Sequence, residues 1–206
     1  MSTMAERRTA YDAYVTHIHG LCRDPGTRRR LSTGLGRPVE ECDQMDKFLT
    51  RYTAGRPGRR AHYTVASLIA LAGPEVHTPG VRPTRRSGTL AAQTEPAGQP
   101  NPPATGVAPD AWFRRPNLGT ALAAAVLDAG WSEDRTADRL HVMTRIGDDQ
   151  LHRRLPTLIR RLLSDGLTPD WGVLLHDLVQ RSYRPDTVGL RWRDAFYLTL
   201  HQPATD

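Results

Sequence analysis

Residues 152–163 read HRRLPTLIRRLL, and their apolar side chains recur at the spacing of an amphipathic helix. At about 100° per residue, Arg153 and Arg160 point nearly opposite to the apolar side of that helix. The apolar side predicts a helix that packs in a bundle. The arginine side has two interpretations. Most such stripes are simply solvated, but a cationic stripe can also bind a polyanion. Pro156, in the middle, predicts a kink or a break between two shorter helices. The apolar side consists of Leu151, Leu155, Leu158, Ile159 and Leu162.

Helical periodicity extends in both directions from this stretch. No run of alternating β-branched residues bounded by turns indicates a strand. The sequence therefore predicts an all-α fold of about nine helices, without an internal repeat. Besides the helix already described, the expected helices lie near residues 3–22, 25–34, 38–52, 62–73, 117–130, 132–146, 169–183 and 188–200.

Several helix starts carry recognisable N-terminal residues. Thr3 and Glu6 have the spacing of a capping box, and Asp24 precedes a proline at the first helical position. Ser132 is expected to cap the helix that follows it, and Asp148 the helix that contains HRRLPTLIRRLL. Thr168 and Pro169 are expected to begin the next helix.

The composition changes abruptly at residues 79–110, which hold seven Pro and four Gly in 32 positions and almost no large apolar side chain. Such a segment cannot bury enough apolar surface to offset its ordering entropy. We therefore expect a Pro/Gly-rich flexible linker there. It would join two helical bundles, an N-terminal one at 1–78 and a C-terminal one at 111–206.

Charge and cysteine content limit the possible classes of protein. The 206 residues carry a net charge of +6, and 27 of the 28 basic residues are Arg. Arginine suits bidentate phosphate contact, but GC-rich coding bias accounts for most of its excess over Lys. Cys22 and Cys42 lack CxxC spacing, which argues against a disulfide framework or a structural zinc site and for a reducing cytoplasm. No apolar run is long enough for a membrane span, and the N-terminus has charges where a signal peptide is apolar. The sequence predicts a cytoplasmic protein.

No reaction centre is apparent among the motifs that usually carry one. Phosphate-loop, dinucleotide-binding, GxSxG and HExxH patterns are absent from the sequence. His17 and His19 would point about 200° apart on a helix, so they do not converge on a metal. Asp148 and Asp149 suit a helix start better than a pair of catalytic carboxylates. We expect no catalytic residue, no metal and no cofactor.

Tryptophan and arginine remain as candidates for nucleic-acid contact. Trp171 and Trp192 lie on the apolar faces of their helices, so Trp112 is the tryptophan expected to be exposed and able to stack on a base. Residues 23–37 carry five Arg and one Asp, and residues 51–60 carry four Arg and no acid. Together with the arginine stripe, these two patches favour a surface for a phosphate backbone.

Four stretches occur in an order and spacing that resemble a known family. They are NLGTALAAAV (117–126), RLHVMTRIGDDQLHRRLPTLIRRLL (139–163), DWGVLLHDL (170–178) and VGLRWRDAFY (188–197). In this order they resemble the CasB family, the small subunit of the type I-E CRISPR Cascade complex. The resemblance covers the C-terminal half closely and extends to the N-terminal half through GTRRRL (26–31).

The resemblance implies a non-enzymatic, all-helical protein of two bundles with a role in antiviral defence. It implies a head-to-tail pair with a second copy, next to the large subunit CasA and the backbone subunits that hold the guide RNA. The small subunit would lie beneath the displaced strand of the target DNA and stabilise the R-loop through sequence-independent contacts.

The resemblance also implies which basic residues face nucleic acid. Arg153 and Arg154 match the family pattern less securely than the others. Acids of the C-terminal half, among them Asp134, Asp138, Asp165 and Asp177, are alternative partners for some arginines. The matching positions are Arg29, Arg30, Arg59, Arg60, Arg139, Arg145, Arg160, Arg161, Arg181 and Arg184.

Two competing interpretations follow from the residues. In the first, the protein is a purely structural assembly subunit, whose arginines pair with acids on neighbouring subunits. In the second, which has less support, it is a helical nuclease whose activity a chelator would abolish.

Overall fold

The computed structural model describes residues 4–56, 58–74, 112 and 115–201. These residues form nine α-helices, one short 3-10 helix (η1) and no strand, so the predicted all-α class is confirmed. The segment 79–110, predicted to be a linker, lies outside the described residues. The elements are α1 (Met4–Cys22), α2 (Pro25–Ser32), η1 (Val39–Glu41), α3 (Asp43–Thr53), α4 (Arg59–Ala72), α5 (Leu118–Ala129), α6 (Glu133–Arg145), α7 (Asp148–Ser164), α8 (Trp171–Arg181) and α9 (Pro185–Leu200).

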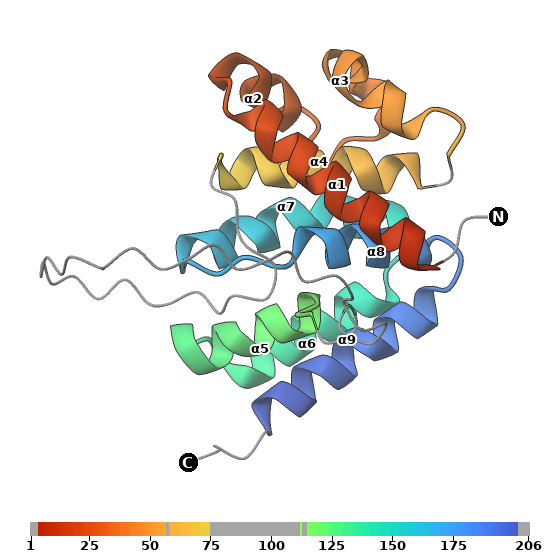
Figure 1. Cartoon of the computed structure of the whole chain (residues 1–206). Helices are drawn as coiled ribbons and strands as arrows, with labels where there is room; N and C mark the ends of the chain where they lie inside the picture. The colour runs from red at the N-terminus through yellow and green to blue at the C-terminus, as the bar shows by residue number, and fades with distance from the viewer. Residues whose placement is uncertain (1–3, 57, 75–111, 113–114, 202–206) are drawn as a thin grey trace, which may run out of the picture.

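The helices form three tiers, with α7 and α8 in the middle one (Figure 1). Helices α1 to α4 lie above them, and α5, α6 and α9 lie below. Helix α4 packs against both α7 and α8, and α1 crosses α8, so the middle tier belongs to both sides.

The buried apolar side chains of the two halves form one continuous core. Helix α4 shows this most clearly, because every residue from Ala61 to Ala70 is buried. A helix can be buried all round only when it has neighbours on every side. The division into bundles at 1–78 and 111–206 stays a prediction, but in this arrangement the two halves share their core.

The capping residues agree with the sequence at two helices and differ at two others. Asp24 accepts a hydrogen bond from the Thr27 N–H at 2.6 Å, and Ser132 caps α6 as predicted. Helix α7, however, is preceded by Gly147, so Asp148 lies inside its first turn and does not cap it. Helix α8 begins two residues later than predicted, at Trp171, because Asp170 is the residue that caps it. Thr3, expected to cap the first helix, lies outside the described residues.

Helix α7 runs without interruption through Pro156, so the predicted break into two helices is wrong. Pro156 is itself buried, and the loop that follows α2 lies against it. A Cβ built on Gly36 would be 3.8 Å from Pro156 Cγ and 3.4 Å from the Arg153 carbonyl oxygen. Packing of the apolar face on one side and of this loop on another surrounds α7 at Pro156, where the helix stays continuous.

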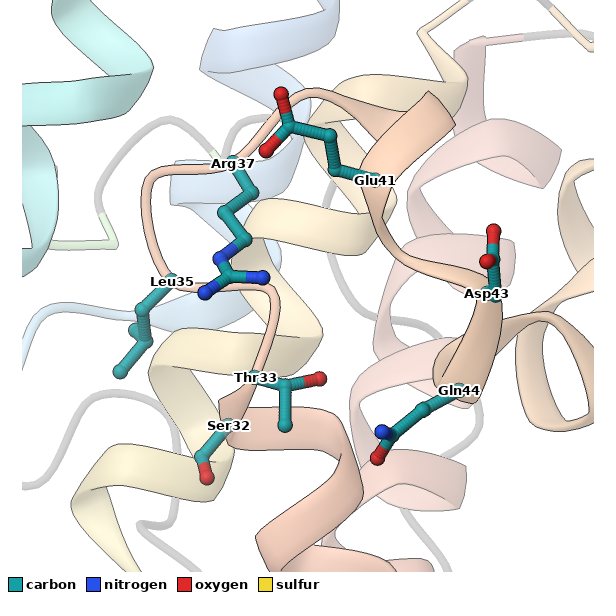
Figure 2. Close-up of a pocket in the computed structure, with 7 residues that line it drawn as sticks. All are labelled: Ser32, Thr33, Leu35, Arg37, Glu41, Asp43 and Gln44. Carbon is teal, nitrogen blue, oxygen red and sulfur yellow. The ribbon is translucent and has the colours of Figure 1, made fainter.

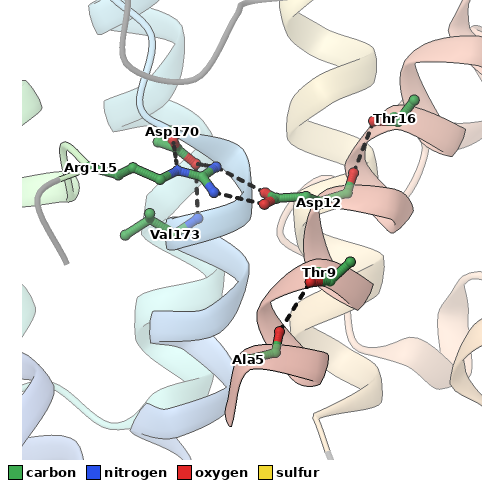
Figure 3. A network of polar contacts seen from close by, with 7 residues as sticks. All are labelled: Ala5, Thr9, Asp12, Thr16, Arg115, Asp170 and Val173. Carbon is green, nitrogen blue, oxygen red and sulfur yellow. Dashed lines mark hydrogen bonds and ion pairs between the residues drawn. The ribbon is translucent and has the colours of Figure 1, made fainter. Parts of the chain in front are cut away.

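Arg115 joins the N-terminal and C-terminal halves (Figure 3). Its Nη1 and Nη2 donate to the Asp12 carboxylate on α1 at 2.8 and 2.9 Å, while Nε and Nη2 donate to Asp170 at the start of α8 at 2.7 Å each. Burial alone would lower the pKa of Arg115, but hydrogen bonds to the two carboxylates outweigh it and raise the pKa.

Trp112 is buried, with 7% of its surface exposed, so the expectation that it is available to a base is wrong. The Arg115 guanidinium carbon lies 4.1 Å from the centroid of the Trp112 ring, and the His176 ring packs edge-on against that ring. Contacts with residues of other helices, which the local sequence does not reveal, place this indole inside the protein.

Candidate nucleic-acid interface

The outer face of α7 carries four arginines. The apolar side chains predicted to face inward (Leu151, Leu155, Leu158, Ile159 and Leu162) are buried, and the four arginines are exposed. Within the ranges that the structure describes, none of the four makes an ion pair with a carboxylate. The helix thus presents four guanidinium groups to solvent: Arg153, Arg154, Arg160 and Arg161.

The fold brings the end of the first N-terminal basic patch against α7. Because Gly36 lies against Arg153, the loop after α2 follows the surface of α7. Arg29 and Arg30, in the last turn of α2, are exposed a few residues before that loop. The loop that ends the first patch is therefore a neighbour of α7 in space.

A polar hollow of about 570 Å³ lies between the end of α2 and the start of α3 (Figure 2). The Arg37 guanidinium extends into it, and the carboxylates of Glu41 and Asp43 are part of the same lining. An anion in this hollow would meet one positive and two negative groups, so we do not include it in the interface. The lining residues are Ser32, Thr33, Leu35, Arg37, Glu41, Asp43 and Gln44.

Two arginines of the second N-terminal patch, Arg59 and Arg60, are already engaged within the protein. Arg60 forms an ion pair with Asp149 in the first turn of α7. Arg59 donates to Asp46 at 3.3 Å and to the Tyr63 hydroxyl at 3.1 Å. Either arginine would have to leave a carboxylate before it contacted a phosphate.

Arg181 is buried, with 3% of its surface exposed. Its Nη2 donates to the backbone carbonyls of Met143, Thr144 and Ile146 at 3.1, 3.2 and 2.8 Å, which ties the end of α8 to the end of α6. Burial lowers the pKa of this guanidinium. The structure therefore corrects the expectation for Arg181, because the side chain stabilises a helix junction and has no exposed guanidinium to offer.

The remaining expected residues lie on the surface at two places. Arg145 is flanked by residues whose carbonyls bind Arg181, and Arg184 follows Arg181 by one turn, so both exposed side chains belong to the same end of the molecule. Arg139 is exposed further along α6. The structure thus distributes these three over α6 and the start of α9, apart from the α7 surface.

Among the described residues, the four acids considered as alternative partners (Asp134, Asp138, Asp165 and Asp177) form no ion pair with the expected arginines. Asp177 is fully buried, where it forms an ion pair with Arg191 and accepts a hydrogen bond from the Trp192 indole at 2.6 Å. Asp165 accepts a hydrogen bond from the Trp131 indole at 2.7 Å. Asp134 and Asp138 are exposed at the surface of α6.

The buried histidines are held in packed surroundings. His176 is next to Asp177, and burial, followed by the charges of Arg191 and Arg8, lowers its pKa to about 4. It is therefore neutral at physiological pH. His19 is buried in α1, while His17 packs on Tyr52 with ring centroids 4.6 Å apart. Among the described residues, no group of three or more His, Cys, Asp or Glu side chains is placed to hold a metal ion.

One contact could not be anticipated from the sequence. The Arg161 guanidinium carbon lies 4.1 Å from the centroid of the Trp131 ring. Trp131 belongs to the loop between α5 and α6, and no local pattern links it to the end of α7.

None of the described helices is long and apolar enough to cross a membrane.

Comparisons with known proteins agree with this fold. A chain from a structure described as "CRISPR RNA-guided surveillance complex" shares 29% identity, with a TM-score of 0.70 over 94% of this chain and 95% of that one. A chain from such a complex described as "pre-nicking" shares 30% identity, with a TM-score of 0.70 over 94% of each chain. The crystal structure of M. ruber CasB shares 23% identity and the same fold, with a TM-score of 0.60 over 94% of each chain.

A search of curated protein sequences gave no match. The family model of the CRISPR-associated protein Cse2 matches residues 27–197, which is most of the sequence and includes both halves. The chain therefore belongs to the Cse2 family of CRISPR-associated proteins.

Proposed function

We propose that the protein is the small subunit of a CRISPR RNA-guided surveillance complex of the Cascade type, with a role in antiviral defence. In this complex it stabilises the R-loop by sequence-independent binding of the displaced single strand of target DNA and of the guide-RNA and protein backbone. Membership of the Cse2 family supports the proposal, as does similarity over nearly the whole chain to components of two surveillance-complex structures. Its protein partners would be the large subunit CasA, the backbone subunits and a second copy arranged head to tail.

The observation that carries the proposal is the exposed arginine face of α7, which has no intramolecular carboxylate partners among the described residues. Phosphate contacts of this kind attract any sequence equally, while base pairing with the guide RNA supplies the specificity. Such a subunit needs no reaction centre, and we infer that it is not an enzyme. The proposed contacts are Arg29, Arg30, Arg139, Arg145, Arg160, Arg161 and Arg184, together with Arg59 and Arg60 if they exchange their present partners.

The test is binding of the full-length protein to single-stranded DNA over a series of salt concentrations. Removal of one arginine–phosphate interaction should reduce the slope of log affinity against log salt by about 0.7. We therefore expect Arg160→Ala with Arg161→Ala to weaken binding and to flatten the slope by about 0.7 for each of the two side chains that contacts a phosphate.

A matched control removes two positive charges elsewhere. Lys47 on α3 and Arg135 on α6 are exposed and lie outside the proposed contacts and both N-terminal patches. Lys47→Ala with Arg135→Ala should leave the slope unchanged. An equal change in both double variants would show a general charge effect, and an unchanged slope in the α7 variant would remove that pair from the interface. A wild-type protein without measurable affinity for single-stranded DNA would favour the purely structural assembly subunit.

A further inference from the structure

The Trp131 indole is held in a fixed orientation between two parts of the fold. Its backbone N–H donates to the Ala125 carbonyl at 3.1 Å, just after the left-handed Gly130 that ends α5. Its indole N–H donates to the Asp165 carboxylate at the end of α7 at 2.7 Å. Only 8% of the Trp131 surface is exposed.

Arg161 covers this ring. Its guanidinium carbon is 4.1 Å from the ring centroid, well inside the range of a cation–π contact. Arg161 remains exposed, and in the described part of the chain its guanidinium has no ion pair. The guanidinium therefore lies over the indole while the Arg161 side chain remains open to solvent.

A planar cation held in this way is suited to stack on a nucleobase. Arginine planes, like aromatic rings, accept unpaired bases, and stacking tolerates any base because each has a π-face. The contact with Trp131 already restricts the Arg161 side chain, so little rotational freedom is lost on binding. Lysine carries the same charge but lacks the plane.

The surroundings favour a base over a phosphate at this position. Asp165, whose carboxylate binds the edge of the indole, places a negative charge one turn beyond Arg161, and that charge opposes a phosphate over the stack. Arg153 and Arg154 lie about 10 Å back along α7 and are exposed without such a neighbour on the next turn. The phosphates of a bound strand can thus lie along the earlier turns of α7, while one of its bases reaches Arg161 in the last turn.

We propose that Trp131 and Arg161 form a stacking platform for one unpaired nucleobase of a single-stranded nucleic acid. This inference rests on the proposed function and adds a subsite to it. Arg161 is the group that touches the base, and Trp131 is the residue that positions Arg161.

The experiment measures binding of the full-length protein to two single-stranded DNA oligonucleotides of equal length, one with all its bases and one with abasic sites. Wild-type protein should bind the base-containing strand at least about fivefold more tightly than the abasic one. Arg161→Lys should bring the ratio of the two affinities close to one. Because lysine keeps the charge, the salt slope should be unchanged. Arg160→Lys is the matched control and should leave the ratio unchanged. With 2-aminopurine in the strand, its fluorescence should be quenched by the wild type and less so by Arg161→Lys.

The outcomes separate the two proposals. If the wild type binds neither strand, the proposed function fails, and the platform fails with it. If it binds with a normal salt slope but Arg161→Lys shows the wild-type ratio and quenching, the platform is wrong and the proposed function stands. If Arg161→Lys weakens both strands equally, Arg161 contacts only phosphate or only stabilises the fold, which also overturns the platform. Melting temperatures of the variants show which of these two roles applies.

Discussion

At the scale of single residues, the arginines of this protein have three distinct environments. Those on the outer face of α7 are exposed, Arg59 and Arg60 pair with carboxylates, and Arg115 and Arg181 are largely enclosed by the fold. Of these three groups, only the first offers positive charge to a ligand without breaking an ion pair or leaving the interior. The enclosed arginines instead join segments that are distant in the sequence, and Arg115 does so through two carboxylates.

Arg115→Ala should reduce the free energy of unfolding by about 3 to 5 kcal/mol, because it leaves a carboxylate uncompensated. The Asp170 side chain is 1% exposed and would retain only its contact with the α8 backbone. Arg115→Lys keeps the positive charge but not the planar guanidinium that donates to both carboxylates, so we expect an intermediate loss of stability. Urea unfolding followed by circular dichroism measures both. Arg135→Ala, at an exposed position in α6, is the control, and a loss for Arg115→Ala no larger than that of the control would contradict the prediction.

At the scale of elements, the stretches that resemble the CasB family are explained by helix packing. In NLGTALAAAV, Asn117 caps α5 by accepting from the Thr120 N–H at 3.1 Å. Gly119 allows α5 to lie directly on the backbone of α9, since a Cβ there would overlap the Trp192 carbonyl group. Trp192 and Phe196, from VGLRWRDAFY, are fully buried. These two motifs build the contact between α5 and α9.

Gly119→Ala should therefore destabilise the protein by about 1 to 3 kcal/mol or more, because α5 and α9 must move apart. Gly20→Ala is a matched control, since Gly20 lies in α1 with nothing within 4 Å of the added Cβ. Alanine is the better helix former, so this control should gain up to about 1 kcal/mol. Thermal unfolding of the two variants beside the wild type would show shifts of opposite sign. A Gly119→Ala variant as stable as Gly20→Ala would mean that the close approach of α5 to α9 is wrong.

At the scale of the whole molecule, the middle tier of α7 and α8 unites the two halves of the chain (Figure 1). Helix α4 contributes ten consecutive buried residues, and α7 and α8 cover part of that surface. Thr64 on α4 and His152 on α7 form a buried hydrogen bond of 2.7 Å across the junction. The N-terminal helices alone would expose this apolar and polar surface to water.

A fragment of residues 1–78 should consequently fail to unfold cooperatively on its own, whereas the full chain should unfold in a single transition. Fragments 1–78 and 111–206 produced together should associate and regain cooperative unfolding, because no core residue is expected in the segment between them. Calorimetry and denaturant titration of each sample test this. Cooperative unfolding of the isolated 1–78 fragment would instead support two independent domains.

The fold class, most helix bounds and the family could be predicted from the sequence, because each depends on local order. Periodicity at 3.6 residues, the caps at Asp24 and Ser132 and the four motif stretches are properties of neighbouring residues. The solvent side of α7 was predictable for the same reason, since the position of an arginine around a helix follows from its number. The local sequence was less informative at Pro156 and Asp148. Packing against other elements accompanies the continuous helix at Pro156, and Gly147, not Asp148, is the residue that precedes α7.

Whether a basic or aromatic side chain is exposed, paired or buried depended on partners far away in the chain. Arg181 and Trp112 are buried, Arg60 forms an ion pair with Asp149, and the Arg161 guanidinium packs on the Trp131 ring. All these contacts arise where separate helices meet, so no local pattern encodes them. The sequence determined that this is an arginine-rich helical protein of the Cse2 family; the tertiary structure alone decided which arginines remain free for a ligand, because packing buries or pairs the others.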